Sequence, residues 1–135
     1  MIYLPLQFFL SCNIKAYTNQ ATYINSLTLK MVKKILAESD TPPIIIIQGD
    51  HGPGAYLDWT SKANSNMKDR FSILNAYYLG GQKSDILYPS ISPVNTFRVV
   101  LNEFFGTHLE ILPDKSYFSL WLTQFRFDDV TNEVK

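Results

Sequence analysis

The sequence has 135 residues, of which 46% are hydrophobic, 14% aromatic and 18% charged, a length and composition that suit one folded domain and argue against disorder. Twelve basic residues balance twelve acidic ones, so charge gives no case for nucleic acid or an anionic membrane as a partner. The single cysteine, Cys12, excludes an intrachain disulfide and a cysteine-based zinc site.

The first twelve residues are apolar, but they lack a positively charged leading region and are broken by Pro5. They therefore fit a signal peptide poorly, and residues 1–10 are predicted to be irregular or an edge strand. The same start would fit the edge of a larger domain, or a coding start inside a longer gene. Cys12 has no nearby histidine or cation and is expected to be a small buried hydrophobe. No apolar run approaches the roughly 20 residues that span a bilayer.

Apolar residues at helical spacing predict a helix over residues 20–37, with Thr18 or Asn19 as its N-cap. Pro42 and Pro43 stop this helix, because a proline disfavours the α conformation in the residue before it. The next residues, Ile44–Ile47, predict a short strand buried on both faces, which is typical of parallel sheets covered by helices. Helix, short loop and strand form half of a βαβ unit, so the predicted fold class is α/β.

Residues 55–68 are polar and predict a surface excursion, and residues 70–79 predict a second strand that ends at Gly80 and Gly81. After a loop over 82–91, Ser92 and Pro93 open a second helix that closes at Gly106. The apolar stripe of this helix is expected in the core; it consists of Val94, Phe97, Leu101, Phe104 and Phe105. The aromatic segment 117–127 predicts a further strand.

The most informative motif is Gly49-Asp50-His51-Gly52, directly after the isoleucine strand. Ligands of open α/β sheets bind beyond the carboxyl ends of strands. A carboxylate and an imidazole suit Zn²⁺ or Mn²⁺, which makes Asp50 and His51 candidate metal ligands. The alternative is a simple strand-to-loop turn in which Asp50 caps the following backbone. Zinc usually takes at least three protein ligands, so this pair is an incomplete site.

Other candidate sites are weaker. Gly49, Gly52 and Gly54 do not form a nucleotide-binding loop, because Pro53 interrupts them and the lysine of a P-loop is missing. No serine-hydrolase elbow of the form G-x-S-x-G occurs. His108 is either a third ligand or, as we expect, a solvated loop residue.

Arg70 and Arg98 could hold an anionic substrate. For Arg98, we expect instead an ion pair with Glu103 or Asp114.

Several stretches together resemble sulfatase-like hydrolases and transferases of the alkaline phosphatase superfamily. Residues 42–53, PPIIIIQGDHGP, resemble the family's metal-binding segment. Residues 92–106, SPVNTFRVVLNEFFG, and 111–118, ILPDKSYF, resemble a downstream helix and loop of a bacterial subgroup that is membrane-anchored with an outward-facing catalytic domain. The resemblance covers residues 17–119, and we expect the chain, residues 1–135, to form a single partial domain of this kind.

The resemblance implies that Asp50 and His51 bind a divalent metal (Zn, Mn, Ca or Mg). The family also uses a nucleophile (Thr, Ser or a formylglycine), an earlier acidic ligand and a further histidine. Those motifs lie upstream of the matching segments, and Cys12 lacks the proline and arginine that follow a formylglycine cysteine. No catalytic residue is therefore assigned.

The expected fold is a partial alkaline-phosphatase-like sheet flanked by helices, the C-terminal portion of a larger domain. The expected function is part of a metal-dependent hydrolase or transferase acting on sulfate or phosphate esters, inactive alone and with weak or absent metal binding. The alternative is a non-catalytic remnant or small interaction domain. A partial sheet would expose apolar surface, which predicts self-association.

Overall fold

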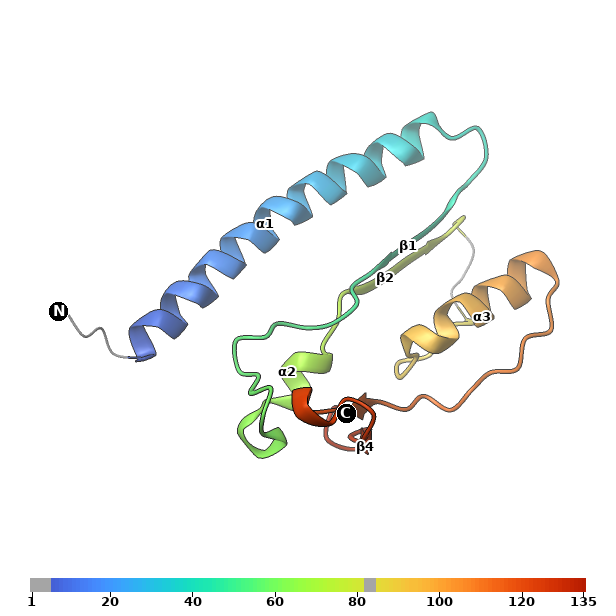
Figure 1. Ribbon diagram of the computed structural model, residues 1–135. Helices are drawn as coiled ribbons and strands as arrows, with labels where there is room; N and C mark the ends of the chain where they lie inside the picture. Colours follow the sequence, from blue (N-terminus) through green and yellow to red (C-terminus); the bar gives the residue numbers. More distant parts are fainter. Residues whose placement is uncertain (1–5, 82–84) are drawn as a thin grey trace. The chain divides into compact units, whose positions relative to one another are not determined.

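The computed structural model describes the backbone of residues 6–81 and 85–135, and the side chains from residue 13 onward within those ranges. Helices and short antiparallel strands place the chain in a mixed α and β class (Figure 1). It divides into two compact units. Unit 1 holds the chain up to Ile45 together with Tyr78–Gly81, and unit 2 holds Ile46–Tyr77 and Gln82–Lys135.

Unit 1 contains the long helix α1, Leu6–Glu38. The predicted helix is therefore confirmed but starts earlier, and the predicted strand over residues 1–10 is wrong from Leu6 on; residues 1–5 lie outside the described part. The expected N-cap Thr18 lies inside the helix, where its hydroxyl donates to the carbonyl oxygen of Ile14 at 2.8 Å. The side chain of Cys12 also lies outside the described part.

Helix α1 ends before the proline pair, as predicted, and Ser39 donates its backbone N–H to the carbonyl oxygen of Ile35 at 3.0 Å. Its apolar stripe is less buried than helical spacing indicated, because Ile24, Leu27 and Met31 are 49%, 42% and 53% exposed. Among the helices that the structure describes, none combines the length and apolar character needed to cross a membrane.

The isoleucine run forms strand β1, Ile44–Gln48, which pairs antiparallel with β2, Asn75–Leu79, in a two-stranded sheet. The strand prediction is confirmed, but the expectation of a parallel pairing in a βαβ unit is wrong for these two strands. The chain between them returns so that β2 runs back along β1, and Gly49 donates its N–H to the carbonyl oxygen of Leu74 at 2.8 Å. Within the described residues β1 pairs with one strand, β2, and its own residues are half-buried rather than fully buried.

The connection between β1 and β2 contains the 3₁₀ turn η1, Lys62–Asn64, and the short helix α2, Met67–Phe71. The side chain of Asn66 caps α2 by accepting the backbone N–H of Asp69 at 3.1 Å. The predicted surface excursion is only partly correct, because Met67 is buried. Arg70 and Phe71, which were expected in a strand, belong to α2.

The core of unit 2 is a small apolar cluster formed by the C-terminal segment and the connection after β1. Its buried members are Met67, Phe118 and Val130. Partly buried side chains pack around them: Leu57, Phe71, Leu120 and Val134. Residues more than 60 positions apart in the sequence thus share one core, which fixes the C-terminal segment against α2.

Helix α3, Pro93–Phe105, begins after Ser92 and ends at Gly106, as predicted. Gly106 adopts the left-handed conformation with φ of 63°, which glycine allows without a steric penalty. The predicted core face is wrong. Two of its members, Phe97 and Phe105, are 57% and 66% exposed, and the buried residues are Asn95, Thr96, Val99 and Val100.

A hydrogen-bond network explains why Thr96 is buried on the same helix as Val99 and Val100. The amide of Gln48 donates to the hydroxyl oxygen of Thr96 at 2.8 Å and to the side-chain oxygen of Asn75 at 3.1 Å. The Tyr77 hydroxyl lies 2.8 Å from the same Thr96 oxygen. Thr96 therefore ties α3 to residues of both strands, and its polar group is satisfied although it is fully buried.

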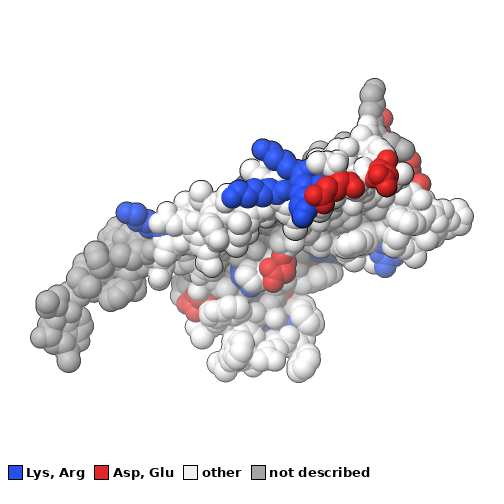
Figure 2. Space-filling view, turned by 90° about the horizontal axis from the view of Figure 1, so that it is seen from above, with Lys and Arg blue, Asp and Glu red and all other residues white. Residues whose placement is uncertain are grey.

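The C-terminal segment contains strands β3, Tyr117–Phe118, and β4, Asp128–Asp129, which pair antiparallel with Tyr117 opposite Asp129. The 3₁₀ turn η2, Trp121–Thr123, lies between them. The strand predicted over residues 117–127 is thus limited to two residues, and Trp121, Leu122 and Phe125 are exposed. Charged side chains on the face drawn in Figure 2 are few and of both signs, as the balanced composition implies.

Candidate functional site

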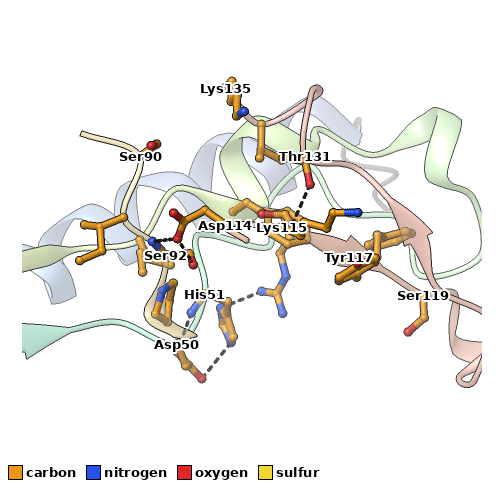
Figure 3. A pocket seen from close by; sticks show the side chains of 18 of the residues that line it. Asp50, His51, Ser90, Ser92, Asp114, Lys115, Tyr117, Ser119, Thr131 and Lys135 are labelled. Atoms are coloured by element: carbon orange, nitrogen blue, oxygen red, sulfur yellow. Dashed lines mark hydrogen bonds and ion pairs between the residues drawn. The ribbon is translucent and has the colours of Figure 1, made fainter. Parts of the chain in front are cut away.

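Unit 2 contains a cavity of about 780 Å³ beside the end of β1 (Figure 3). Its wall comes from the turn after β1, from α2, from the segment before α3 and from residues 114–119 and 131–135. Charged residues of both signs line it: Asp50, Arg70, Asp114, Lys115 and Lys135. A cavity with convergent polar groups at the end of a strand is the default candidate for a binding site.

Asp50 and His51 lie on the turn that follows β1, at the rim of this cavity (Figure 3). Their side chains turn toward each other, with Nε2 of His51 3.6 Å from Oδ2 of Asp50. The second carboxylate oxygen accepts the backbone N–H of His51 at 2.9 Å. Their side chains are 89% and 52% exposed respectively, so both are open to a ligand from solvent.

This separation fits two ligands of one metal ion. Two donors that each lie about 2.1 Å from zinc at a tetrahedral angle are about 3.4 Å apart. The 3.6 Å between Nε2 of His51 and Oδ2 of Asp50 is close to that value. The pair nevertheless supplies two ligands only: among the described side chains no three of His, Cys, Asp and Glu cluster as a metal site would require.

The His51 ring is held from its other side. Nδ1 lies 2.9 Å from the carbonyl oxygen of Gly52 and 2.7 Å from Nη1 of Arg70. The same Nη1 donates to the Gly52 oxygen at 3.2 Å. Most metal-binding histidines donate the N–H of their other ring nitrogen to an oxygen acceptor. The Gly52 contact is of this kind, whereas the Arg70 contact brings a second donor to Nδ1.

Arg70 comes from α2 and reaches the turn because the two backbones touch. Gly52 donates its N–H to the carbonyl oxygen of Arg70 at 2.7 Å. The guanidinium carbon lies 5.6 Å from the ring centroid of Trp59, a cation–π distance. Trp59 in turn meets Trp121 edge-on, with ring centroids 6.2 Å apart. An aromatic wall therefore fixes the position of the arginine beside His51.

Asp114 lines the same cavity but is committed to a structural network (Figure 3). One carboxylate oxygen accepts the backbone N–H and the hydroxyl of Ser92 together with the amide of Asn95. The other accepts the Tyr88 hydroxyl at 2.8 Å. Because both oxygens are occupied by donors, Asp114 is not available as a third metal ligand without losing these bonds.

The network sets the ionisation of Asp114 and Tyr88. Burial alone would raise the pKa of Asp114, but hydrogen bonds from Ser92, Tyr88 and Asn95 outweigh it and lower the pKa below 3.8. Burial, followed by the hydrogen bond to Asp114, raises the pKa of the Tyr88 hydroxyl above its usual 10.0. Asp114 is therefore ionised and Tyr88 neutral at pH 7.

The lowered pKa of Asp114 predicts a stability contribution that depends on pH. The contribution is fully present above the pKa of the unfolded chain, about 3.9, and is lost as the pH falls through the lower folded value. Urea denaturation measures the free energy of unfolding of the wild type and of Asp114→Asn between about pH 6 and pH 2. The difference between the two proteins should become smaller as the pH falls. A difference that is constant across this range would contradict the prediction. Other carboxylates with lowered pKa, such as Asp58, are common to both proteins and cancel in the difference.

The remaining candidates lie outside this arrangement. His108 is an exposed residue in the loop after α3 and does not form a three-ligand group with Asp50 and His51. Arg98 donates to the carbonyl oxygen of Glu110 at 2.9 Å, and the expected ion pair with Glu103 or Asp114 is not formed.

Two features of the site cannot be predicted from the sequence. Trp59 lies in a polar segment and becomes important only because Arg70 stacks on it. The bonds that join Asn95 to Asp114 and Leu112 connect residues 17 to 19 positions apart, and no local pattern predicts them.

Comparisons of the chain with models of known protein families, with curated proteins and with solved structures found no match.

Proposed function

We propose that this chain is part of a sulfatase-like hydrolase or transferase of the alkaline phosphatase superfamily, acting on sulfate or phosphate esters. Its two-stranded sheet and α3 would then be the C-terminal portion of an alkaline-phosphatase-like fold. The observation that supports the proposal most is the pairing of Asp50 and His51, 3.6 Å apart at the rim of a cavity that also holds cationic side chains.

In this proposal the chain's own residues have limited roles. Asp50 and His51 hold a divalent metal through Oδ2 and Nε2, and Arg70 and Lys115 attract the anionic ester into the cavity. The metal, when bound, polarises the transferred group and stabilises its charge. No residue of the chain is assigned as nucleophile, so we expect no turnover of a generic aryl phosphate or aryl sulfate by this polypeptide, even with added Mn²⁺ or Zn²⁺.

The incomplete ligand set predicts weak or absent metal binding, and the 3.6 Å between Nε2 of His51 and Oδ2 of Asp50 favours weak binding over none. Metal binding by the chain therefore tests the proposal. Titration calorimetry with Zn²⁺ and Mn²⁺ should give weak, saturable binding that His51→Gln and Asp50→Asn each weaken by about tenfold or more, since even the supporting residues of metal sites contribute that much. His108→Gln and Asp40→Asn are matched controls, because both residues are exposed and lie outside the cavity lining. They should bind metal as the wild type does. Equal losses in the site and control variants, or no binding by the wild type, would contradict the proposal.

An interaction domain without catalysis is the second candidate, and one observation favours it. The loop around η2 exposes large apolar side chains: Trp121, Leu122, Phe125 and Phe127. Such patches on a surface mark contacts with other molecules. Sedimentation tests this candidate: self-association through the loop should be lost in a Leu122→Ser and Phe125→Ser double variant, whereas self-association through the partial sheet should persist in it.

A further inference from the structure

Nδ1 of the neutral His51 ring lies close to two groups, but it can form a hydrogen bond with only one of them at a time. Nδ1 lies 2.7 Å from Nη1 of Arg70 and 2.9 Å from the carbonyl oxygen of Gly52. A guanidinium only donates hydrogen bonds and a carbonyl only accepts them. Nδ1 can therefore accept from Arg70, or donate to Gly52, but a neutral imidazole cannot do both.

The two choices place the single ring proton on different nitrogens. When Nδ1 accepts from Arg70, the proton is on Nε2, the nitrogen that faces Asp50 Oδ2 at 3.6 Å, and no lone pair there is free for a metal. When Nδ1 carries the proton and donates to Gly52, Nε2 presents its lone pair on the Asp50 side. Nδ1–H and the Arg70 N–H would then face each other as two donors at 2.7 Å, so Arg70 has to move.

We propose that Arg70 is a positioning residue that holds His51 in the form unable to bind metal, so that loading of the site requires Arg70 to leave Nδ1. This inference rests on the proposed function in taking Nε2 as the metal-binding atom. After leaving Nδ1 the guanidinium can keep its contact with Trp59, because its carbon lies 5.6 Å from the ring centroid. Arg70 thus sets how readily the Asp50–His51 pair accepts a metal.

Long-range ¹H–¹⁵N spectra of the full-length chain without metal test the inference directly, because they report which ring nitrogen carries the proton. In the wild type, His51 should be protonated at Nε2. In Arg70→Met, which keeps an unbranched side chain against Trp59, the proton should move toward Nδ1, next to the Gly52 carbonyl. His108, the other histidine, is the internal reference and should not change. Arg126→Met, at an exposed arginine outside the cavity lining, is the matched control.

Metal titration of the same variants gives the second readout. Arg70→Met should bind Zn²⁺ about three- to tenfold more tightly than the wild type, which is the scale of one charge-assisted hydrogen bond at a partly exposed position. Tighter binding with an unchanged His51 proton position would show a simple charge effect and overturn the inference. Weaker binding would overturn it as well, since Arg70 would then support the ligand.

The two proposals fail in different ways. If no variant binds metal, but the proton on His51 still moves when Arg70 is removed, the proposed function fails and the hydrogen-bond competition stands. If metal binding depends on Asp50 and His51, but the spectra of Arg70→Met match those of the wild type, the function stands and the role of Arg70 is wrong.

Discussion

Gly52→Ala is expected to lower the free energy of unfolding by about 2–3 kcal/mol, the scale of an overpacked interior position. A Cβ atom at Gly52 would meet the carbonyl oxygens of Asp69, Ser72 and Arg70, the last two at 2.6 and 3.0 Å. These oxygens belong to the backbone at the end of α2 and cannot turn aside as a flexible side chain could. The glycine is needed because two backbones touch, and the variant should also separate His51 from Arg70.

Gly54→Ala is the matched control for Gly52→Ala. It introduces the same methyl group two residues further along the same turn, where no atom lies within 4 Å of the added Cβ. Its stability should stay within about 0.5 kcal/mol of the wild type, as for most exposed substitutions. Chemical denaturation of both variants measures the difference, and equal stabilities would show that Gly52 is not packed against α2.

Asn95→Ala is expected to cost about 3–4 kcal/mol, because it leaves several buried polar groups without partners. The Asn95 side chain is fully buried; it donates to the carbonyl oxygen of Leu112 at 2.7 Å and to Asp114 at 3.0 Å, and it accepts the N–H of Leu112 at 3.0 Å. These bonds attach the segment after α3 to the start of the helix. Losing them should loosen the cavity wall that Asp114 and Lys115 form.

Asn102→Ala provides the comparison on the same helix. Its side chain also bonds the segment after α3: it donates to the carbonyl oxygen of Leu109 at 2.8 Å and accepts the Leu109 N–H and the Thr107 hydroxyl, each at 2.7 Å. Both bonds to Leu109 are exposed, so water can replace them. We expect Asn102→Ala to lower the free energy of unfolding by about 1 kcal/mol.

A double-mutant cycle between Asn95→Ala and Asp114→Ala should show strong coupling, because the two side chains share one network. Additive losses would contradict the network.

Helices were predictable where a local rule decides them. Pro93 and Gly106 mark α3 because proline fixes the first helical turn and glycine takes the left-handed cap at low cost, and both bounds are confirmed. The start of α1 was missed because apolar residues at its beginning suit either a strand or a helix, and nothing local separates the two. Helix ends that proline or glycine marks are therefore predictable from the sequence, whereas the start of α1, which no such residue marks, is not.

The buried face of α3 shows the limit of hydrophobic patterning. Phe97 and Phe105 formed the expected core face, yet Asn95 and Thr96 are the fully buried residues of this helix. Hydrophobicity predicts which face of a helix is buried only where apolar residues are available to pack against that face. The inward face of α3 is mixed: Val99 and Val100 are buried on it together with Asn95 and Thr96. Asn95 and Thr96 are buried because Asp114 and Gln48 hydrogen-bond with them.

The turn at the end of β1 is encoded locally, because Gly49-Asp50-His51-Gly52 follows a run of isoleucines and an adjacent Asp and His need no distant residue to bring them together. The surroundings of that turn depend on how distant parts of the chain fold against it. Arg70 reaches His51 because Gly52 lets α2 approach within hydrogen-bonding distance, at 2.7 Å between the two backbones. Asp114 is held in place because Ser92, Tyr88 and Asn95 donate hydrogen bonds to its oxygens. Such contacts depend on chain folding over tens of residues, which no local pattern encodes.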